Sequence, residues 1–183
     1  MKNRLIVLSG PSGVGKGTIV NKLLRLGNYS LSVSCTTRAP RAGETDGISY
    51  FFISREEFSK EIKSGGFLEY SEHFENFYGT PKKFVEEKLK THNVILEIEV
   101  DGALQVKRAH PEALLIMILP PSVDELRARL QGRGSESAEK IEQRIKRMDY
   151  ELSKKGEYDY TVINDDLDKA VAEIEKIIEG ENK

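Results

Sequence analysis

The stretch "SGPSGVGKGT", residues 9–18, separates an apolar run, "RLIVL" at 4–8, from an amphipathic one, "IVNKLLRL" at 19–26. Gly10, Gly15 and Lys16 have the spacing G-x-x-x-x-G-K between a predicted strand and a predicted helix. Glycines in such a loop let backbone N–H groups point inward at an anion, and the helix N-terminus adds the positive end of its dipole. Lys16 would supply a mobile cation for the β and γ phosphates of a nucleotide. The alternative is an ordinary strand–helix turn with a surface lysine.

The predicted ATP-phosphate site consists of Gly10, Pro11, Ser12, Gly13, Val14, Gly15, Lys16, Gly17 and Thr18. Position 17 is glycine, whereas the motif usually has Ser or Thr there as a ligand of Mg²⁺. Because glycine has no hydroxyl, residue 17 cannot ligate the metal through a side chain. We therefore expect Mg²⁺ to be held mainly by phosphates and water, as it often is.

Short apolar runs between helical patterns predict the strands of a parallel sheet covered on both faces. These runs are Leu5–Leu8, Val94–Val100, Leu114–Leu119 and Tyr160–Ile163. Together with the glycine-rich loop they predict an α/β fold, with a P-loop NTPase-type parallel sheet flanked by helices. Ser54 with Glu57, and Ser122 with Glu125, have the spacing of a capping box and predict helix starts.

Two segments differ from this pattern and predict additions to the core. Residues 31–80 contain "LSVSCTTR", "ISYFFIS" and "GFLEYSEHF", which look like strands, and a helix near 55–64. This segment is interpreted as an inserted mixed α+β subdomain. Residues 127–147 are arginine-rich and broken by "QGRGSES", which predicts a small helical lid with a mobile loop. The chain is then one domain, 1–183, whose core is 1–30, 81–126 and 148–183.

Composition limits the classes of function. The 183 residues carry a net charge of −2, which argues against a broad electrostatic surface for nucleic acid or membrane. A single cysteine, Cys35, excludes an internal disulfide framework, and the longest apolar run, "ALLIMIL" at 113–119, is too short to span a bilayer. The start of the chain has no adequate signal-peptide core. We expect a cytoplasmic protein, a monomer or small homo-oligomer.

A second anion site is predicted in "SVSCTTRAPRAGETDGISYFF", residues 32–52. Arg38 and Arg41 flank a proline, Tyr50 follows them, and Tyr78 lies in "FYGTP". Guanidinium groups and tyrosine hydroxyls are suitable donors for a phosphate dianion. A solvated basic turn is the alternative, and chemistry alone does not decide between the two.

The ordered set of segments resembles guanylate kinase. It comprises "GPSGVGKGT", "SVSCTTRAPRAGETDGISYFF", "FLEYSEHFENFYGTP", "RLQGRG" and "VINDDLDKA", and it covers nearly the whole chain. The resemblance implies an ATP:GMP phosphotransferase that uses Mg²⁺ with ATP, accepts GMP and dGMP, and contains a GMP-binding subdomain at 31–80.

The resemblance also implies roles for single residues on the GMP side. Arg38, Arg41, Tyr50 and Tyr78 match the ligands of the GMP phosphate, and Glu44 matches an acidic residue that orients the arginines. The guanine-reading positions are Ser34, Glu69, Thr80 and Glu99. A carboxylate at 69 can accept both N1–H and N2–H of guanine, and the hydroxyl at 80 can donate to O6. Adenine would leave that carboxylate without a partner.

On the ATP side, the resemblance implies that Lys16, Arg129, Arg133 and Arg144 are the catalytic cations. They would stabilise the charge on the phosphoryl group in transit. Asn164 and Asp165 match the segment near the adenine, although Asp165 or Asp166 could equally be a helix N-cap. Glu97 stands where the family commonly has Asp and is the candidate for contact with the metal or Lys16. Arg127 and Arg147 are interpreted as ordinary surface charges.

Other functions remain open at this point. One is a P-loop kinase for another small phosphate acceptor, which the intact GMP-reading set weighs against. Another is a non-catalytic guanylate-kinase-like module that binds proteins. Such modules often have damaged phosphate loops, whereas Lys16 and the loop glycines are intact here.

Overall fold

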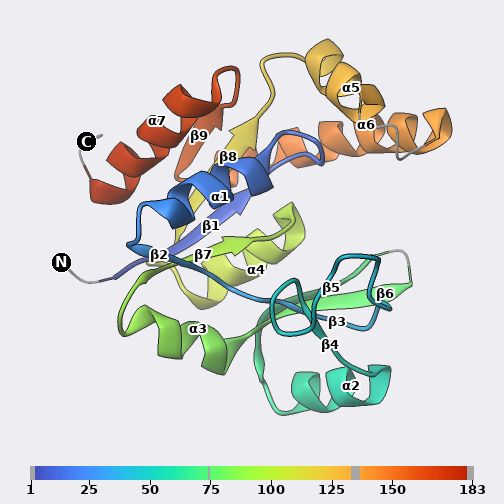
Figure 1. Cartoon of the computed structure of the whole chain (residues 1–183), viewed down its shortest axis with the longest axis vertical. Coiled ribbons are helices and arrows are strands. Elements are labelled where there is room, and N and C mark those ends of the chain that lie inside the picture. Colours follow the sequence, from blue (N-terminus) through green and yellow to red (C-terminus); the bar gives the residue numbers. More distant parts are fainter. Residues whose placement is uncertain (1–2, 74, 133–136, 181–183) are drawn as a thin grey trace.

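The computed structural model describes residues 3–73, 75–132 and 137–180. Within them, a parallel five-stranded sheet forms the centre of the molecule (Figure 1), with the strand order β2-β7-β1-β8-β9. Its strands are β1 (Leu5–Ser9), β2 (Tyr29–Leu31), β7 (Asn93–Glu97), β8 (Leu114–Leu119) and β9 (Tyr160–Ile163). The predicted parallel sheet and α/β fold are confirmed.

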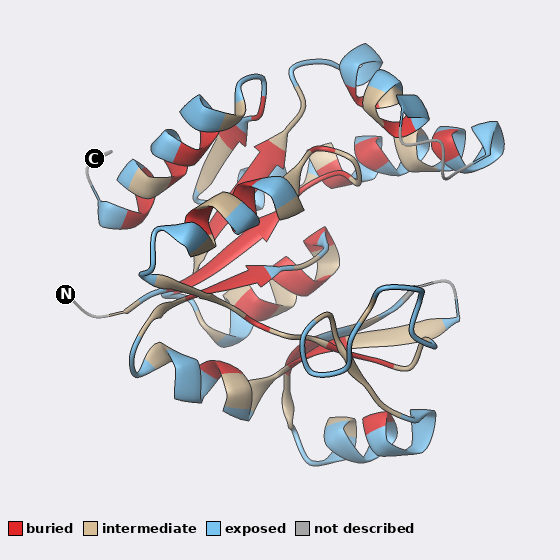
Figure 2. Ribbon diagram, viewed as in Figure 1, coloured by how far each residue is buried: buried red, intermediate tan, exposed pale blue. Residues whose placement is uncertain are grey.

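Helices cover both faces of this sheet, which explains why its strands are almost continuously apolar. On one face, α1 (Lys16–Arg25) and α7 (Leu167–Glu179) pack against Ile6 and Leu8 of β1. On the other, α3 (Lys82–Leu89) and α4 (Val100–Ala109) pack against Leu5 and Val7. Figure 2 shows the central strands as the most buried part of the molecule. None of the described helices is long and apolar enough to cross a membrane.

A second, mixed sheet lies beside the core, with the order β4-β3-β6-β5. Its strands are β3 (Cys35–Thr36), β4 (Phe51–Phe52), β5 (Phe67–His73) and β6 (Asn76–Pro81). Helix α2 (Arg55–Lys63) covers it, and the ring of Phe58 lies 4.5 Å from that of Phe67 and 5.4 Å from that of Phe77. The capping box of Ser54 and Glu57 is present at the start of α2.

Two helices overlap the segment predicted as a lid, α5 (Val123–Gly132) and α6 (Ala138–Ser153). They pack together through Leu126, Leu130, Ile141 and Met148. The predicted limits, 127 and 147, fall inside these helices. Residues 133–136 of the predicted mobile loop lie outside the described residues. A 3₁₀ turn, η1 (Lys155–Glu157), connects α6 to β9.

One predicted strand is too long. The run Val94–Val100 forms a strand only as far as Glu97, and α4 begins at Val100 with Glu99 as its N-cap residue. The backbone N–H of Ala103 already donates to the carbonyl of Glu99, at 2.9 Å. Val100, Ala103 and Val106 are buried at helical spacing, so packing favours helix there. Glu97 and Glu99 therefore do not lie on one strand, although both fall within the run predicted as one.

Candidate active site

The glycine-rich loop connects β1 to α1 at the carboxyl edge of the sheet. Gly10 and Gly15 have φ angles of 136° and 99°, which favour glycine. A Cβ on Gly10 would lie 2.1 Å from the carbonyl oxygen of Ile118, and one on Gly15 would lie 2.5 Å from Nδ2 of Asn164. Both glycines are required by the backbone conformation and by the closeness of neighbouring atoms. The local geometry is that of an anion-binding loop before a helix N-terminus.

Lys16, the first residue of α1, folds back over this loop. Its ammonium group donates to the carbonyl of Gly10 at 2.5 Å and to that of Pro11 at 3.1 Å. The cation is therefore held at the loop that would receive the phosphates. This is the position that the sequence predicted for it.

A cavity of about 410 Å³ adjoins the loop and brings together six of the residues predicted on the ATP side. It is lined by Gly13, Gly15, Thr18, Arg129, Gly132, Asn164, Asp165 and Leu167. Asn164 is buried, and its side-chain amide donates to the carbonyl of Val14 at 2.8 Å. Asn164 thus ties the end of β9 to the loop. Asp166, not Asp165, is the N-cap residue of α7.

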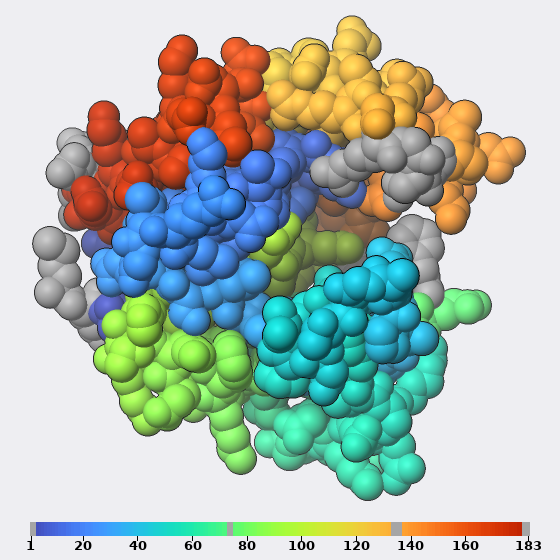
Figure 3. All heavy atoms as spheres, viewed as in Figure 1, coloured from blue at the N-terminus to red at the C-terminus, as the bar shows by residue number. Residues whose placement is uncertain are grey.

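Two of the arginines predicted for the lid reach the same region from α5 and α6. Arg129 donates through both Nη atoms to the carbonyl of Asn164, each at 3.1 Å, and Arg144 hydrogen-bonds the hydroxyl of Ser12 in the loop. Arg133 lies outside the described residues, and its role stays a prediction. Figure 3 shows the surface hollowed between the segments coloured blue, cyan and orange.

The predicted site for the GMP phosphate is assembled around Glu44. Arg38 donates to both carboxylate oxygens of Glu44, at 3.0 and 2.8 Å, and the backbone N–H of Arg41 donates at 2.7 Å. The hydrogen bond from Arg38 is the largest cause of the lowered pKa of the Glu44 carboxyl. The rings of Tyr50 and Tyr78 lie 6.0 Å apart, and the Arg38 guanidinium lies 5.5 Å from the Tyr50 ring. The orienting role predicted for Glu44 fits this arrangement.

The predicted guanine-reading pair is buried on neighbouring strands. Glu69 on β5 is paired in register with Thr80 on β6, and the two are 5% and 0% exposed. The Thr80 hydroxyl donates to Oε1 of Glu69 at 2.6 Å. Thr80 is therefore a strand residue bound to Glu69, and Pro81 is the N-cap residue of α3. Ser34 lies half-buried directly before β3.

Electrostatics connects the two predicted anion sites through Glu97. Burial is the main cause of the raised pKa of Tyr50, and the charge of Glu97 adds to that rise. Glu97 is exposed at the end of β7, yet desolvation by the surrounding protein raises the pKa of its carboxyl. The positive charge of Lys16 opposes the rise. Tyr50 of the predicted GMP site and Lys16 of the predicted ATP site thus both interact electrostatically with the Glu97 carboxylate.

Arg147, interpreted from the sequence as a surface charge, is 43% exposed and forms ion pairs with other elements. From α6 it donates to Oε2 of Glu99 at 2.6 Å, and it lies 3.5 Å from the buried carboxylate of Glu151. It therefore joins the lid helix to the start of α4 and to one of the predicted guanine-reading residues. Its position four residues before Glu151 was the available signal. Arg127, the other arginine so interpreted, pairs with Glu142 and joins α5 to α6.

Cys35 is expected to resist alkylation in the folded protein. It is buried in β3, and burial, with smaller contributions from Glu61 and Asp46, raises the pKa of its thiol to about 11. Because the thiolate is the nucleophile, iodoacetamide at pH 8 should react roughly 10²-fold more slowly than with an unfolded cysteine. The rate should rise with pH up to about 11 and become fast in urea. Fast labelling of the native protein at pH 8, followed by mass spectrometry, would contradict this.

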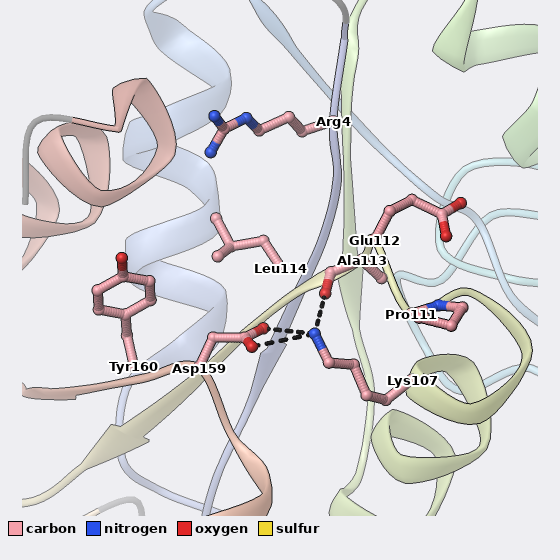
Figure 4. Close-up of a pocket in the computed structure, with 8 residues that line it drawn as sticks. All are labelled: Arg4, Lys107, Pro111, Glu112, Ala113, Leu114, Asp159 and Tyr160. Carbon is pink, nitrogen blue, oxygen red and sulfur yellow. Dashed lines mark hydrogen bonds and ion pairs between the residues drawn. The ribbon is translucent and has the colours of Figure 1, made fainter. Parts of the chain in front are cut away.

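A second hollow, of about 590 Å³, lies at the opposite end of the sheet (Figure 4). It is bordered by the starts of β1, β8 and β9. Lys107 there donates to both carboxylate oxygens of Asp159, at 3.0 and 2.9 Å, and to the carbonyl of Ala113 at 2.8 Å. Ligands of open α/β sheets bind at the carboxyl ends of the strands, so the loop edge remains the candidate active site.

Comparison with known proteins agrees with this geometry. A family model described as "Guanylate kinase" matches residues 2–181. The chain belongs to the guanylate kinase family. It is 53% identical to the guanylate kinase of Synechococcus sp. (strain CC9311) over 175 residues, which cover 94% of this chain and 92% of that protein. It is 49% identical to the guanylate kinase of Listeria innocua, over 97% of this chain and 88% of that protein.

A solved structure of a guanylate kinase has the same fold. The crystal structure of guanylate kinase from Anaplasma phagocytophilum superimposes with a TM-score of 0.79, at 36% identity, over 98% of this chain and 86% of that one. The resemblance drawn from the sequence motifs is therefore confirmed at the level of family and fold. The division into core, GMP-binding subdomain and lid, and the roles of single residues, stay predictions.

Proposed function

We propose that this chain transfers the γ-phosphoryl group of ATP to GMP, and to dGMP, to give ADP and GDP or dGDP. The observation that carries the proposal is the pair of predicted anion sites: Lys16 is held at the glycine-rich loop, and Arg38 is held by the carboxylate of Glu44. Membership of the guanylate kinase family supports it. The proposed substrates are free nucleotides, handled in the cytoplasm by a monomer or small homo-oligomer.

The proposed chemistry is a direct transfer without a covalent enzyme intermediate. The GMP phosphate is already an anionic nucleophile, so the main tasks are to bring two anions together and to neutralise charge. Lys16 is held at the loop. Arg144 contacts the same loop by a hydrogen bond to the hydroxyl of Ser12. Arg129 is fixed against the carbonyl of Asn164 at the edge of the adjoining cavity. With Arg133, these cations would stabilise the transferring group.

The residues around the loop fit a Mg²⁺ ion that accompanies ATP, although position 17 has no hydroxyl. A Cβ on Gly17 would lie 3.7 Å from both carboxylate oxygens of Glu97. The carboxylate therefore stands close to where a Ser or Thr side chain would begin, and carboxylates are preferred ligands of Mg²⁺ or of its bound waters. When bound, the metal would neutralise charge on the β and γ phosphates. Glu97 is the proposed residue that holds it, together with the phosphates and water.

Base selection is proposed to come from Glu69. A buried carboxylate that accepts from N1–H and N2–H of guanine would face the N1 acceptor of adenine instead, and that mismatch is costly. Thr80 donates to Glu69 here. Its hydroxyl can rotate to donate to O6 instead. Ser34 and Glu99 are proposed as further contacts to the base.

The test is ADP formation from Mg·ATP with GMP, dGMP, AMP, CMP and UMP as acceptors. We expect turnover with GMP and dGMP and a preference in kcat/KM over AMP on the order of 10⁴-fold. GMP binding without turnover would favour a non-catalytic binding module. Absence of both binding and turnover would favour another phosphate acceptor.

A further inference from the structure

Helix α4 packs directly against strand β5, although α4 covers the central sheet and β5 belongs to the second sheet. Figure 1 shows α4 between the central sheet and the second sheet, next to β5. This contact brings α4 to the buried carboxylate of Glu69. The side chains of residues 102 and 105 share one face of the helix because they are three positions apart.

Gly102 leaves the space that the Glu69 carboxylate occupies. A Cβ at position 102 would lie 2.6 Å from Oε2 of Glu69 and 3.1 Å from its Cδ, whereas ordinary contacts of a Cβ are 3.4–4 Å. Gly102 lies within α4 and has no positive φ angle, so its backbone would accept alanine. Alanine would even favour the helix. The close approach to Glu69, and not the backbone, explains the glycine.

Gln105 attaches the same helix to the residue after Glu69. Its side-chain amide accepts from the backbone N–H of Tyr70 at 3.3 Å and donates to the Tyr70 carbonyl at 3.0 Å. Because β5 is an edge strand of the second sheet, this amide satisfies backbone groups that no neighbouring strand pairs. The two hydrogen bonds fix the distance between β5 and α4 at the position of Glu69.

We propose that Gly102 and Gln105 are positioning residues that hold the Glu69 carboxylate in the orientation needed to read guanine. In this structure, Thr80 on the neighbouring strand donates to one carboxylate oxygen, and Gly102 of α4 leaves room for the other. The carboxylate can then accept two parallel hydrogen bonds from N1–H and N2–H without reorganising. This inference rests on the proposed phosphorylation of GMP.

The test is the Gly102→Ala variant, assayed with GMP and with IMP, which lacks the 2-amino group. The added methyl group should displace the carboxylate by about 1 Å, and misplacement on that scale costs up to about 10²-fold. We expect the KM for GMP to rise by about 30- to 100-fold while the KM for ATP stays unchanged. The ratio of kcat/KM for GMP to that for IMP should fall about tenfold, since IMP offers only one of the two donors.

Two further variants make this test decisive. Gly156→Ala is the matched control, because a Cβ there meets nothing within 4 Å, and we expect wild-type kinetics. Gln105→Ala should shift the GMP to IMP ratio in the same direction as Gly102→Ala, by about threefold. If Gly102→Ala left the ratio of kcat/KM for GMP to that for IMP unchanged, whether or not both activities fell, the positioning role would be overturned. A wild-type protein that does not phosphorylate GMP would instead overturn the proposed function.

Discussion

Replacing Lys16 with methionine is expected to lower kcat for ADP formation from Mg·ATP and GMP by about 10³-fold. Methionine keeps most of the length of the side chain but removes the ammonium group that is held by the carbonyls of Gly10 and Pro11. Without that cation, the negative charge on the β and γ phosphates is not balanced during transfer. GMP binding, measured by calorimetry without ATP, should stay within about twofold, because the anion site of Arg38 and Glu44 is untouched.

Lys22→Met is the matched control for this experiment. Lys22 lies on the same helix, α1, and pairs with Asp168 at the surface, away from the loop. The same chemical change there should leave kcat unaltered, since an exposed ion pair contributes little. If Lys16→Met lost less than tenfold in kcat, Lys16 would not be a catalytic cation, and the loop would serve only to bind nucleotide.

The parts of the fold that the sequence predicted are those dictated by local pattern. Strands β1, β8 and β9 are continuous apolar runs because helices cover both of their faces. The phosphate-binding loop follows from glycine and lysine spacing alone. In contrast, β6 was not predicted, since "NFYGTP" has no apolar run and becomes a strand through antiparallel pairing with β5. The end of β7 was misjudged because "LEIEV" alternates like a strand.

The parts of the site that the sequence did not predict depend on contacts between distant residues. Arg147 meets Glu99 across 48 positions, and Gln105 meets Tyr70 across 35. No local spacing marks such a pair. Gly102 could not be recognised from local sequence either, because the proposed need for glycine there comes from the closeness of Glu69 and not from an unusual backbone angle. The sequence therefore indicated the residues of the predicted site better than those that hold them in place.

Replacing Glu69 with glutamine is expected to lower kcat/KM for GMP by about 10³- to 10⁴-fold. Glutamine has nearly the same volume, and its amide oxygen can still accept from the Thr80 hydroxyl, which lies 2.6 Å from Oε1 of Glu69. The protein should therefore fold. The amide NH₂, however, would point a donor at the N1–H and N2–H donors of guanine, and two donors cannot pair. The KM for ATP should stay unchanged, since Glu69 lies on the GMP side.

The change in specificity distinguishes base reading from a general loss of activity. Adenine has an acceptor at N1, so the glutamine amide can pair with AMP, and the ratio of kcat/KM for AMP to that for GMP should rise. Glu72→Gln is the matched control: Glu72 lies on the same strand, β5, and is exposed, so both parameters should match wild type. A Glu69→Gln variant that retained kcat/KM for GMP within threefold would show that this carboxylate does not read the base. Selectivity would then have to come from Ser34, Thr80 and Glu99.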